Sequence, residues 1–178
     1  MGYLQEKLHL LQPGGRVLVP GDGGGRNGVW LARQGFTVDI LDYSAEGLAA
    51  ARQWADECGV MVGLAQADVT AWAWPQGEYD AVVSVYLHLH ADDRARVHQA
   101  MLGALKPGGY LIVEAFHRDQ MVNSSGGPRD PAQLFSEVDI QSDLATAKEI
   151  EVRRESIILN ESDLHRGPAV LLRAMCRV

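Results

Sequence analysis

The stretch "VLVPGDGGGRNG", residues 17 to 28, decides the fold, because a short apolar run breaks into a proline and then five glycines within eight positions. The apolar run predicts a buried strand, and "NGVWLARQ" at residues 27–34 predicts a helix. Glycine here gives up ordering entropy and adds no packing. Gly21, Gly23 and Gly25 would let the main chain turn tightly and approach a ligand, with helix N–H groups pointing at it. A nucleotide-like cofactor is therefore expected, the alternative being a tight strand-to-helix turn without a ligand.

The rest of the chain alternates apolar strands with helices. We expect strands at 16–19, 36–42, 60–68, 79–87 and 110–116, and helices at 3–11, 27–34, 44–57, from 92 or 93 to about 105, and from 131 to about 145. Parallel strands joined by helical crossovers form a sheet that is covered on both faces. Residues 148–159 and 168–178 are long extended segments separated by an eight-residue turn, which predicts a closing antiparallel hairpin. The expected fold is a doubly wound, Rossmann-like α/β sheet with this hairpin at one edge.

Composition narrows the class of protein. The 178 residues are 47% apolar and 22% charged, which is typical of a soluble globular protein and predicts a single domain, residues 1–178. The net charge is −7 and the basic residues are scattered, so nucleic acid is not an expected partner. No stretch approaches 18 consecutive apolar residues and the N-terminus lacks a leader pattern, so we expect a cytoplasmic protein without a membrane partner. Cys58 and Cys176 have neither zinc-site nor disulfide-framework spacing.

Two carboxylates follow predicted strands at the edge where a ligand would bind. Asp42 ends the second strand, where its carboxylate can accept from both hydroxyls of a ribose. The alternative for Asp42 is a cap for the next helix, although Ser44 is the better cap. Asp68 ends the third strand, where its carboxylate could receive an adenine amino group while the Val69 N–H addresses the ring. For Asp68 an ordinary turn aspartate is nearly as good an interpretation.

The glycine spacing separates two cofactor classes, dinucleotides and S-adenosylmethionine. Counted from Gly21, the third glycine of a dinucleotide motif falls on Arg26, which is too large for close helix–strand packing. Counted from Gly23, the motif fits, but the strand would then run across Pro20, which cannot donate to a central ladder. An NAD-dependent reductase is therefore the less favoured alternative.

Five motifs together resemble class I S-adenosylmethionine-dependent methyltransferases in order and spacing. These motifs are "VLVPGDGGGRN", "LDYS", "QADV", "YDAVVSVYLHL" and "LKPGGYLIVEAF", and the similarity runs over residues 15 to 116. Within that family, "GRN", "GGPRDP" and "DLHRG" are similar to a bacterial branch related to tellurite-resistance and thiopurine methyltransferases. The resemblance implies a seven-stranded sheet in the order 3-2-1-4-5-7-6.

The resemblance also assigns cofactor contacts. It implies that the methionine part lies along Gly21, Gly23 and Gly25, and that Arg26 and Asn27 brace the loop or the cofactor carboxylate. It places Asp42 and Tyr43 at the ribose and adenine, and Asp68 and Val69 at the adenine. It also places Val85 and Tyr86 near the sulfonium. One position departs from the pattern, since most of the family is acidic where Val19 stands and small where Asp22 stands. Asp22 is then expected to take over a hydrogen bond to the cofactor amino group, the alternative being weaker affinity.

Polar residues after the later strands are candidates for an acceptor pocket. They are Tyr86, His88, His117, Arg118, His165 and Arg166, and the last two could instead form a solvated hairpin tip. A satisfied loop histidine is the alternative for His88, and for His117 and Arg118 a role in the site is left open. His90 and His98 lack a third ligand at suitable spacing, so no metal is expected. The loop at 117–130 is one candidate lid, the alternatives being an open site or one closed by a second subunit.

Methyl transfer from a sulfonium needs alignment and exclusion of water more than a catalytic side chain. The chain lacks the N/D-P-P-Y element that amide and base amino methyltransferases share, and neither cysteine is placed as a nucleophile for cytosine. A small-molecule substrate is therefore expected. The function predicted from the sequence is methyl transfer to a small soft or anionic acceptor, such as a thiol or a selenium or tellurium oxyanion. A non-catalytic cofactor-binding module is the alternative, and the oligomeric state is left open.

Overall fold

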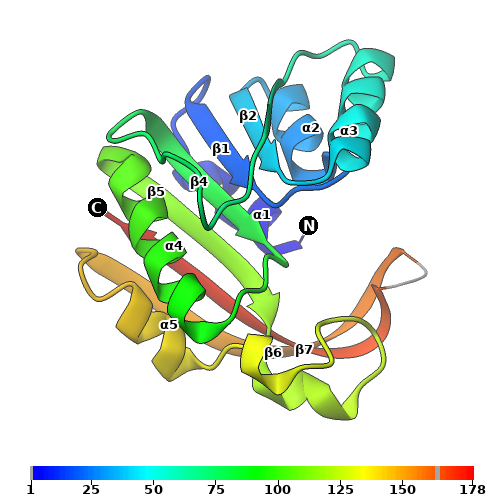
Figure 1. The fold of residues 1–178 in the computed structure, drawn as a ribbon, viewed down its shortest axis with the longest axis vertical. Coiled ribbons are helices and arrows are strands. Elements are labelled where there is room, and N and C mark those ends of the chain that lie inside the picture. The colour runs from blue at the N-terminus through cyan, green and yellow to red at the C-terminus, as the bar shows by residue number, and fades with distance from the viewer. Residues whose placement is uncertain (1, 163–164) are drawn as a thin grey trace.

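A twisted sheet forms the centre of the computed structural model, which describes residues 2–162 and 165–178 (Figure 1). Its seven strands lie in the order β3-β2-β1-β4-β5-β7-β6, as expected. The strands are β1 (Arg16–Pro20), β2 (Thr37–Asp42), β3 (Gly63–Gln66), β4 (Tyr79–Val85), β5 (Leu105–Phe116), β6 (Glu149–Ser162) and β7 (His165–Arg177). The first five strands are parallel, and β7 runs antiparallel between β5 and β6. The predicted doubly wound fold is confirmed.

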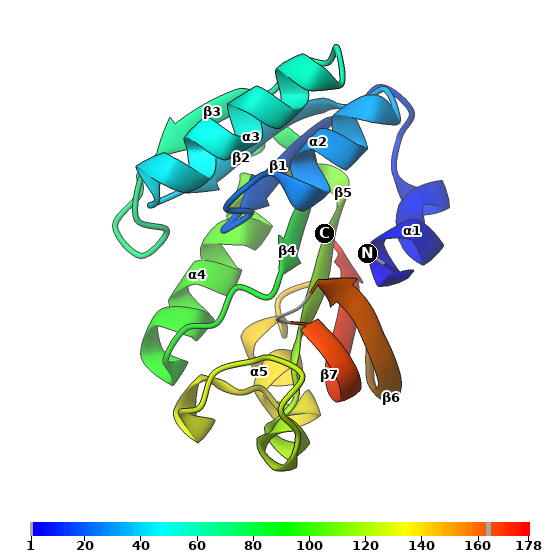
Figure 2. The same cartoon turned by 90° about the vertical axis from the view of Figure 1, so that its right-hand side faces the viewer.

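Helices cover both faces of the sheet. Successive side chains of the buried strands point to opposite faces, so both faces present apolar residues that need covering. Val17 and Val19 point to the face packed by α1 (Gly2–Lys7), α2 (Arg26–Arg33) and α3 (Ala45–Glu57). Leu18 points to the other face, where α4 (Ala91–Ala104) and α5 (Glu137–Asp143) pack. Figure 2 shows α2 and α3 side by side over the end of the sheet that carries β1 to β3. A strand that is apolar on both sides is what a central position in such a sheet requires.

The start of α3 follows from a single serine. Ser44 has extended backbone, and its hydroxyl accepts a hydrogen bond from the Gly47 N–H at 3.0 Å. This arrangement satisfies one of the N–H groups that have no partner within the helix. Because Ser44 caps α3, the Asp42 carboxylate at the end of β2 is not needed as the helix cap.

The segment predicted as one helix from 131 to about 145 is interrupted. A short 3-10 turn spans Pro131–Gln133, and α5 starts only at Glu137, after a capping box formed by Ser136 and Asp139. Between them Leu134 and Phe135 are extended and fully buried. Burial of these two side chains against the sheet overrides the helical pattern, and it sets the chain beside the end of β5 through the His117–Phe135 bridge.

The closing hairpin was predicted with an eight-residue turn, and that prediction is wrong. Strand pairing continues through Asn160 with Arg166 and Ser162 with His165, with a bulge between residues 160 and 162. The polar residues read as a turn are therefore strand residues at a sheet edge, where polarity is common. His165 consequently stands on β7 and not on a loop tip, and the "DLHRG" motif begins at residues 163–164, which lie outside the described residues.

Candidate active site

Two adjoining cavities open at the carboxyl ends of β1, β2 and β4, where the strand order reverses. The larger cavity has a volume of about 680 Å³ and the smaller cavity about 410 Å³. Gly21, Tyr86 and His165 line both cavities, so the two spaces meet at these residues. This position is the one at which doubly wound sheets bind ligands.

The glycine loop forms the floor of the smaller cavity. Gly23 has a φ of +53°, and a Cβ placed on it would meet no heavy atom within 4 Å, so bare main chain faces open space there. Gly25 has a φ of +83°, and a Cβ on it would lie 2.8 Å from the Ala51 Cβ on α3. Gly25 lines neither cavity, and its lack of a side chain lets the loop pack closely against α3. The loop therefore presents a cradle for a ligand at Gly21 and Gly23.

Asp42 joins the glycine loop to the end of β2. Its Oδ2 accepts a hydrogen bond from the Gly23 N–H at 2.7 Å, and its Oδ1 accepts from the Ser44 N–H at 2.9 Å. The residue is 6% exposed and lines the larger cavity. A carboxylate offers about four acceptor positions, so two remain for the hydroxyls of a ligand. This geometry fits the ribose contact expected from the sequence.

Asp22 caps α2 from a position before the helix. Its Oδ1 accepts from the Asn27 N–H at 3.0 Å and from the Asn27 side-chain amide at 2.8 Å, and its Oδ2 accepts from the Gly28 N–H at 2.7 Å. Burial raises the pKa of this carboxyl to about 6, against the hydrogen bonds that lower it. Asp22 lines the smaller cavity as predicted, but its carboxylate is committed to the helix, which sequence reasoning did not anticipate.

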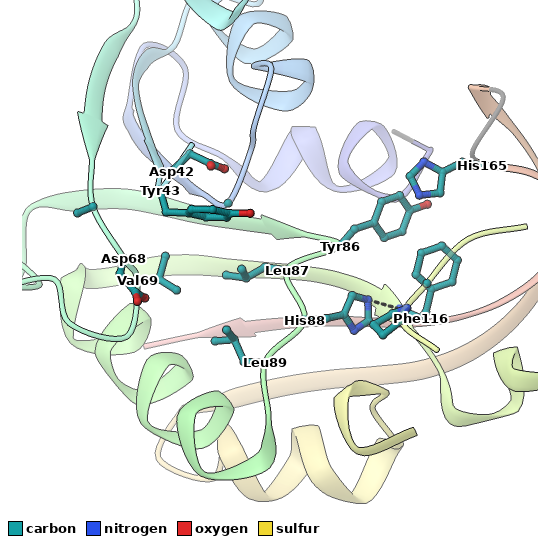
Figure 3. Close-up of a pocket in the computed structure, with 14 residues that line it drawn as sticks. Asp42, Tyr43, Asp68, Val69, Tyr86, Leu87, His88, Leu89, Phe116 and His165 are labelled. Atoms are coloured by element: carbon teal, nitrogen blue, oxygen red, sulfur yellow. Dashed lines mark hydrogen bonds between the residues drawn. The ribbon is translucent and has the colours of Figure 1, made fainter. Parts of the chain in front are cut away.

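The adenine contacts predicted from the sequence lie together at one end of the larger cavity. Figure 3 shows Asp42, Tyr43, Asp68 and Val69 on one side and Tyr86, His88, Phe116 and His165 on the other. Tyr43 is 78% exposed at the rim, where its ring could cover a ligand. Hydrogen bonds from the Thr70 N–H and hydroxyl hold the pKa of Asp68 below its usual range. Val69 and Leu87 give this end of the cavity apolar walls.

Three aromatic rings gather where the two cavities meet. The Tyr86 ring stacks on Phe116 with centroids 4.7 Å apart, and the His165 ring lies 5.1 Å from Tyr86. Tyr86 is the one non-glycine residue with positive φ, +58°, among the described residues. Such backbone is unfavourable for a large side chain and occurs at functional sites. Phe116 was missed in the sequence, although an aromatic residue that ends a predicted strand was the available signal.

His88 lines the larger cavity, but main-chain groups occupy both of its ring nitrogens. Its Nδ1 lies 2.8 Å from the Gln133 carbonyl oxygen, and its Nε2 accepts from the Phe116 N–H at 3.2 Å. A carbonyl only accepts and an N–H only donates, so the proton is on Nδ1. Burial lowers the pKa of His88 to about 4. His88 is therefore a neutral side chain that fixes the end of β5 and the 131–135 segment.

Three other predicted site residues lie outside both cavities. His117 is buried, with Nε2 3.0 Å from Glu137 and Nδ1 accepting from the Asp119 N–H. Arg118 is exposed and forms an ion pair with Asp139 at 2.9 Å, and Arg166 is exposed on β7. The geometry does not bring His117, Arg118 or Arg166 to the cavity that holds Tyr86 and His165.

The loop at 117–130 contributes Gly127 and Pro128 to the wall of the larger cavity. Gln120, which is 2% exposed, fixes the loop: its Nε2 donates to Ser125 Oγ at 3.1 Å and to the Gly126 carbonyl at 3.0 Å, and its Oε1 accepts from the Val170 N–H at 2.9 Å. The loop is thus tied to β7. Gln120 gave no signal in the sequence.

The comparison with known protein families decides between the readings of the glycine loop. A family described as "Methyltransferase domain" matches residues 17–109. The chain belongs to this methyltransferase family. The match covers β1 to the start of β5, and it leaves the β6–β7 hairpin outside.

Relatives and solved structures agree with this methyltransferase assignment. The ubiquinone biosynthesis O-methyltransferase of Pectobacterium carotovorum is 37% identical over 120 residues, which are 67% of this chain and 50% of the relative. The enzyme of the same name from Sodalis glossinidius is 39% identical over 108 residues, 60% of this chain and 43% of the relative. The chain spans about half the length of the curated relatives it matches.

Two solved structures show the same fold. TehB from Haemophilus influenzae aligns with a TM-score of 0.81 at 21% identity, covering 99% of this chain and 62% of TehB. A SAM-dependent methyltransferase from Methanosarcina mazei aligns with a TM-score of 0.78 at 18% identity, covering 96% of this chain and 95% of the other. The expected cofactor, S-adenosylmethionine, agrees with the family and with the description of this second structure.

The residues that line the two cavities fit that cofactor. The smaller cavity offers bare main chain at Gly23 for an amino-acid tail, and Asp42 offers acceptors for ribose hydroxyls. The apolar wall at Val69 and Leu87 suits a base. Among the described residues, no group of three His, Cys, Asp or Glu side chains could hold a metal ion. None of the helices in that part of the chain has the length and apolar character needed to cross a membrane.

Proposed function

We propose that this chain transfers the methyl group of S-adenosylmethionine to a small, mostly apolar acceptor that attacks through a thiol or an aromatic hydroxyl. The observation that carries the proposal is the meeting of two unlike cavities at Tyr86 and His165. The smaller cavity is floored by glycines and lined by charged and polar side chains that include Arg26, Asn27 and Glu161, as an amino-acid tail requires. The far end of the larger is walled by aromatic and aliphatic side chains, as an apolar acceptor requires.

Charge distribution in the larger cavity supports a neutral acceptor over an oxyanion. Its lining residues include no Lys or Arg, within the part of the chain that the structure describes, and its two carboxylates, Asp42 and Asp68, lie at the adenine end. His88 is uncharged at neutral pH because burial lowers its pKa to about 4. Selenite or tellurite would find no Lys or Arg among the side chains that line this cavity, and burying a charge with few partners is costly. Of the acceptors expected from the sequence, the thiol is therefore favoured, and the aromatic hydroxyl joins it.

His165 is the residue best placed to accept a proton from the acceptor. Burial and the charge of Arg26 lower its pKa, so its imidazole is neutral at pH 7. Its ring packs beside Tyr86 and Phe116, within the wall that an acceptor would contact. A thiol is partly ionised near neutral pH, whereas an aromatic hydroxyl with a pKa of about 10 gains from a base. We therefore expect His165 to matter more for a hydroxyl acceptor than for a thiol.

The test combines binding with turnover. Calorimetry with S-adenosylhomocysteine and with NADH comes first, followed by transfer of labelled methyl to a panel of catechols, phenols, aryl thiols, selenite and tellurite. Binding of S-adenosylhomocysteine with product from a thiol or a hydroxyl would support the proposal. Product from the oxyanions alone would overturn the acceptor class. Tight binding with no product from any class would favour a non-catalytic module, and preferential binding of NADH would overturn the whole proposal.

A further inference from the structure

An ion pair crosses the smaller cavity between elements that are far apart in the chain. Arg26, the first residue of α2, places its Nη1 2.9 Å from Oε2 of Glu161 near the end of β6. Both residues line the cavity floored by the glycine loop. The Arg26 side chain is 36% exposed and the Glu161 side chain 19%, so water screens this pair only in part. The hairpin thereby supplies one wall of a cavity whose other lining residues come from the β1–α2 turn, α3 and the end of β4.

The other groups in this cavity leave an ammonium group short of partners. Val19 is apolar and 1% exposed, so it provides no carboxylate. Asp22 gives its acceptor positions to three donors at the start of α2. Asn27 is 4% exposed, and its Oδ1 has no hydrogen-bond partner among the described residues. Buried polar oxygens are almost always bonded, so an unpartnered one beside a cavity indicates a donor that arrives with a ligand.

We propose that Arg26 and Glu161 form a subsite for a zwitterionic amino-acid tail, with Arg26 binding the α-carboxylate and Glu161, together with Asn27, binding the α-ammonium. The inference rests on the proposed function, because the ligand it concerns is the methionine part of the cofactor. A guanidinium offers a planar fork that matches a carboxylate, and a carboxylate accepts from an ammonium by a charge-assisted bond. The hairpin, which lies outside the family match, would then take part in binding the cofactor.

Two ligands that differ only in the tail test the subsite. S-adenosylhomocysteine carries the zwitterion, and 5′-methylthioadenosine has the same nucleoside without it. We expect the wild-type protein to bind S-adenosylhomocysteine at least about 10-fold more tightly by calorimetry. Glu161→Gln and Arg26→Gln should each raise the dissociation constant of S-adenosylhomocysteine about 10- to 100-fold and change that of 5′-methylthioadenosine less than about twofold.

A matched control is Glu149→Gln, which makes the same change at the other end of β6, where the side chain is 65% exposed and 3.7 Å from Arg177. It should leave both affinities unchanged. Unchanged affinity for S-adenosylhomocysteine in Glu161→Gln would overturn the inference, as would an equal loss for both ligands, since that indicates a purely structural role. If the wild-type protein binds neither nucleoside, the proposed function itself fails, so the two failures are distinguishable.

Discussion

The carboxylate of Asp42 accepts a hydrogen bond from the Gly23 N–H at 2.7 Å, which fixes the end of β2 against the glycine loop that follows β1. The same carboxylate lines the larger cavity, so one side chain both shapes the loop and faces the ligand. Charge-assisted bonds to two ribose hydroxyls would be lost with it. Asp42→Ala should raise the dissociation constants of S-adenosylhomocysteine and of 5′-methylthioadenosine alike, by about 10- to 100-fold in calorimetry. Asp56→Ala, an exposed change on α3, should alter neither affinity.

The buried carboxyl of Asp22 should make the protein more stable in mild acid. Its folded pKa of about 6 lies above the ordinary value of 3.8, so the fold favours the protonated form. That contribution is fully present below pH 3.8 and is lost as the pH rises through 6. Between pH 5 and 7 the loss is about 1 kcal/mol in the free energy of unfolding. Asp22→Asn should remove this slope in urea titrations at the two pH values, and an unaltered slope would contradict the raised pKa that burial gives this carboxyl.

The buried imidazole of His88 should make the protein less stable in mild acid. Burial lowers its folded pKa to about 4 from 6.5, so its contribution to stability is present above pH 6.5 and is lost as the pH falls toward 4. From pH 7 to 5 we expect a loss of about 2 kcal/mol from this group. His88→Gln can still donate to the Gln133 carbonyl and should flatten the loss, as measured by urea unfolding. A histidine that titrates near 6.5 by NMR would show that the two main-chain contacts are wrong.

Loss of the Gln120 amide should weaken binding of the acceptor and leave binding of the cofactor unchanged. The reason is that Gln120 ties the 117–130 loop to β7 through Ser125, Gly126 and Val170. Gln120→Leu leaves the buried Val170 N–H without its acceptor, at a cost of about 1–3 kcal/mol in stability. We expect KM for the acceptor to rise about 10-fold by the loss of this alignment, with S-adenosylhomocysteine affinity unchanged within about twofold. Gln53→Leu on the exposed side of α3 is the control. Equal losses for acceptor and cofactor would indicate general unfolding.

The β1–α2 turn and the strand periodicity predicted a doubly wound sheet because both are local signals, whereas the order of its strands came from the resemblance to methyltransferases. Asp42 and Tyr86 could be placed at the site because parallel strands bring their carboxyl ends to one edge. The hairpin turn was misplaced because an edge strand tolerates the polar residues that also mark turns. Glu161 and Gln120 were missed for a different reason, since their partners Arg26 and Val170 lie 135 and 50 residues away in the chain.

The contacts of the histidines differ from the roles predicted for them, because sequence position does not reveal what a ring nitrogen contacts. His88 and His165 both line the larger cavity, and main-chain groups of neighbouring segments occupy both ring nitrogens of His88. His117 follows the same strand end as Phe116, and the turn of the chain sends it toward Glu137. A one-residue step along a strand reverses the face to which a side chain points.

A crystal structure of the protein with S-adenosylhomocysteine tests the central claim most directly, through the distance from the Asp42 carboxylate to the ribose oxygens. We predict both hydroxyls within hydrogen-bond range of Asp42, about 2.5–3.0 Å, and the amino-acid tail over Gly23 in the smaller cavity. A sugar bound elsewhere, with nothing against the glycine loop, would contradict the account.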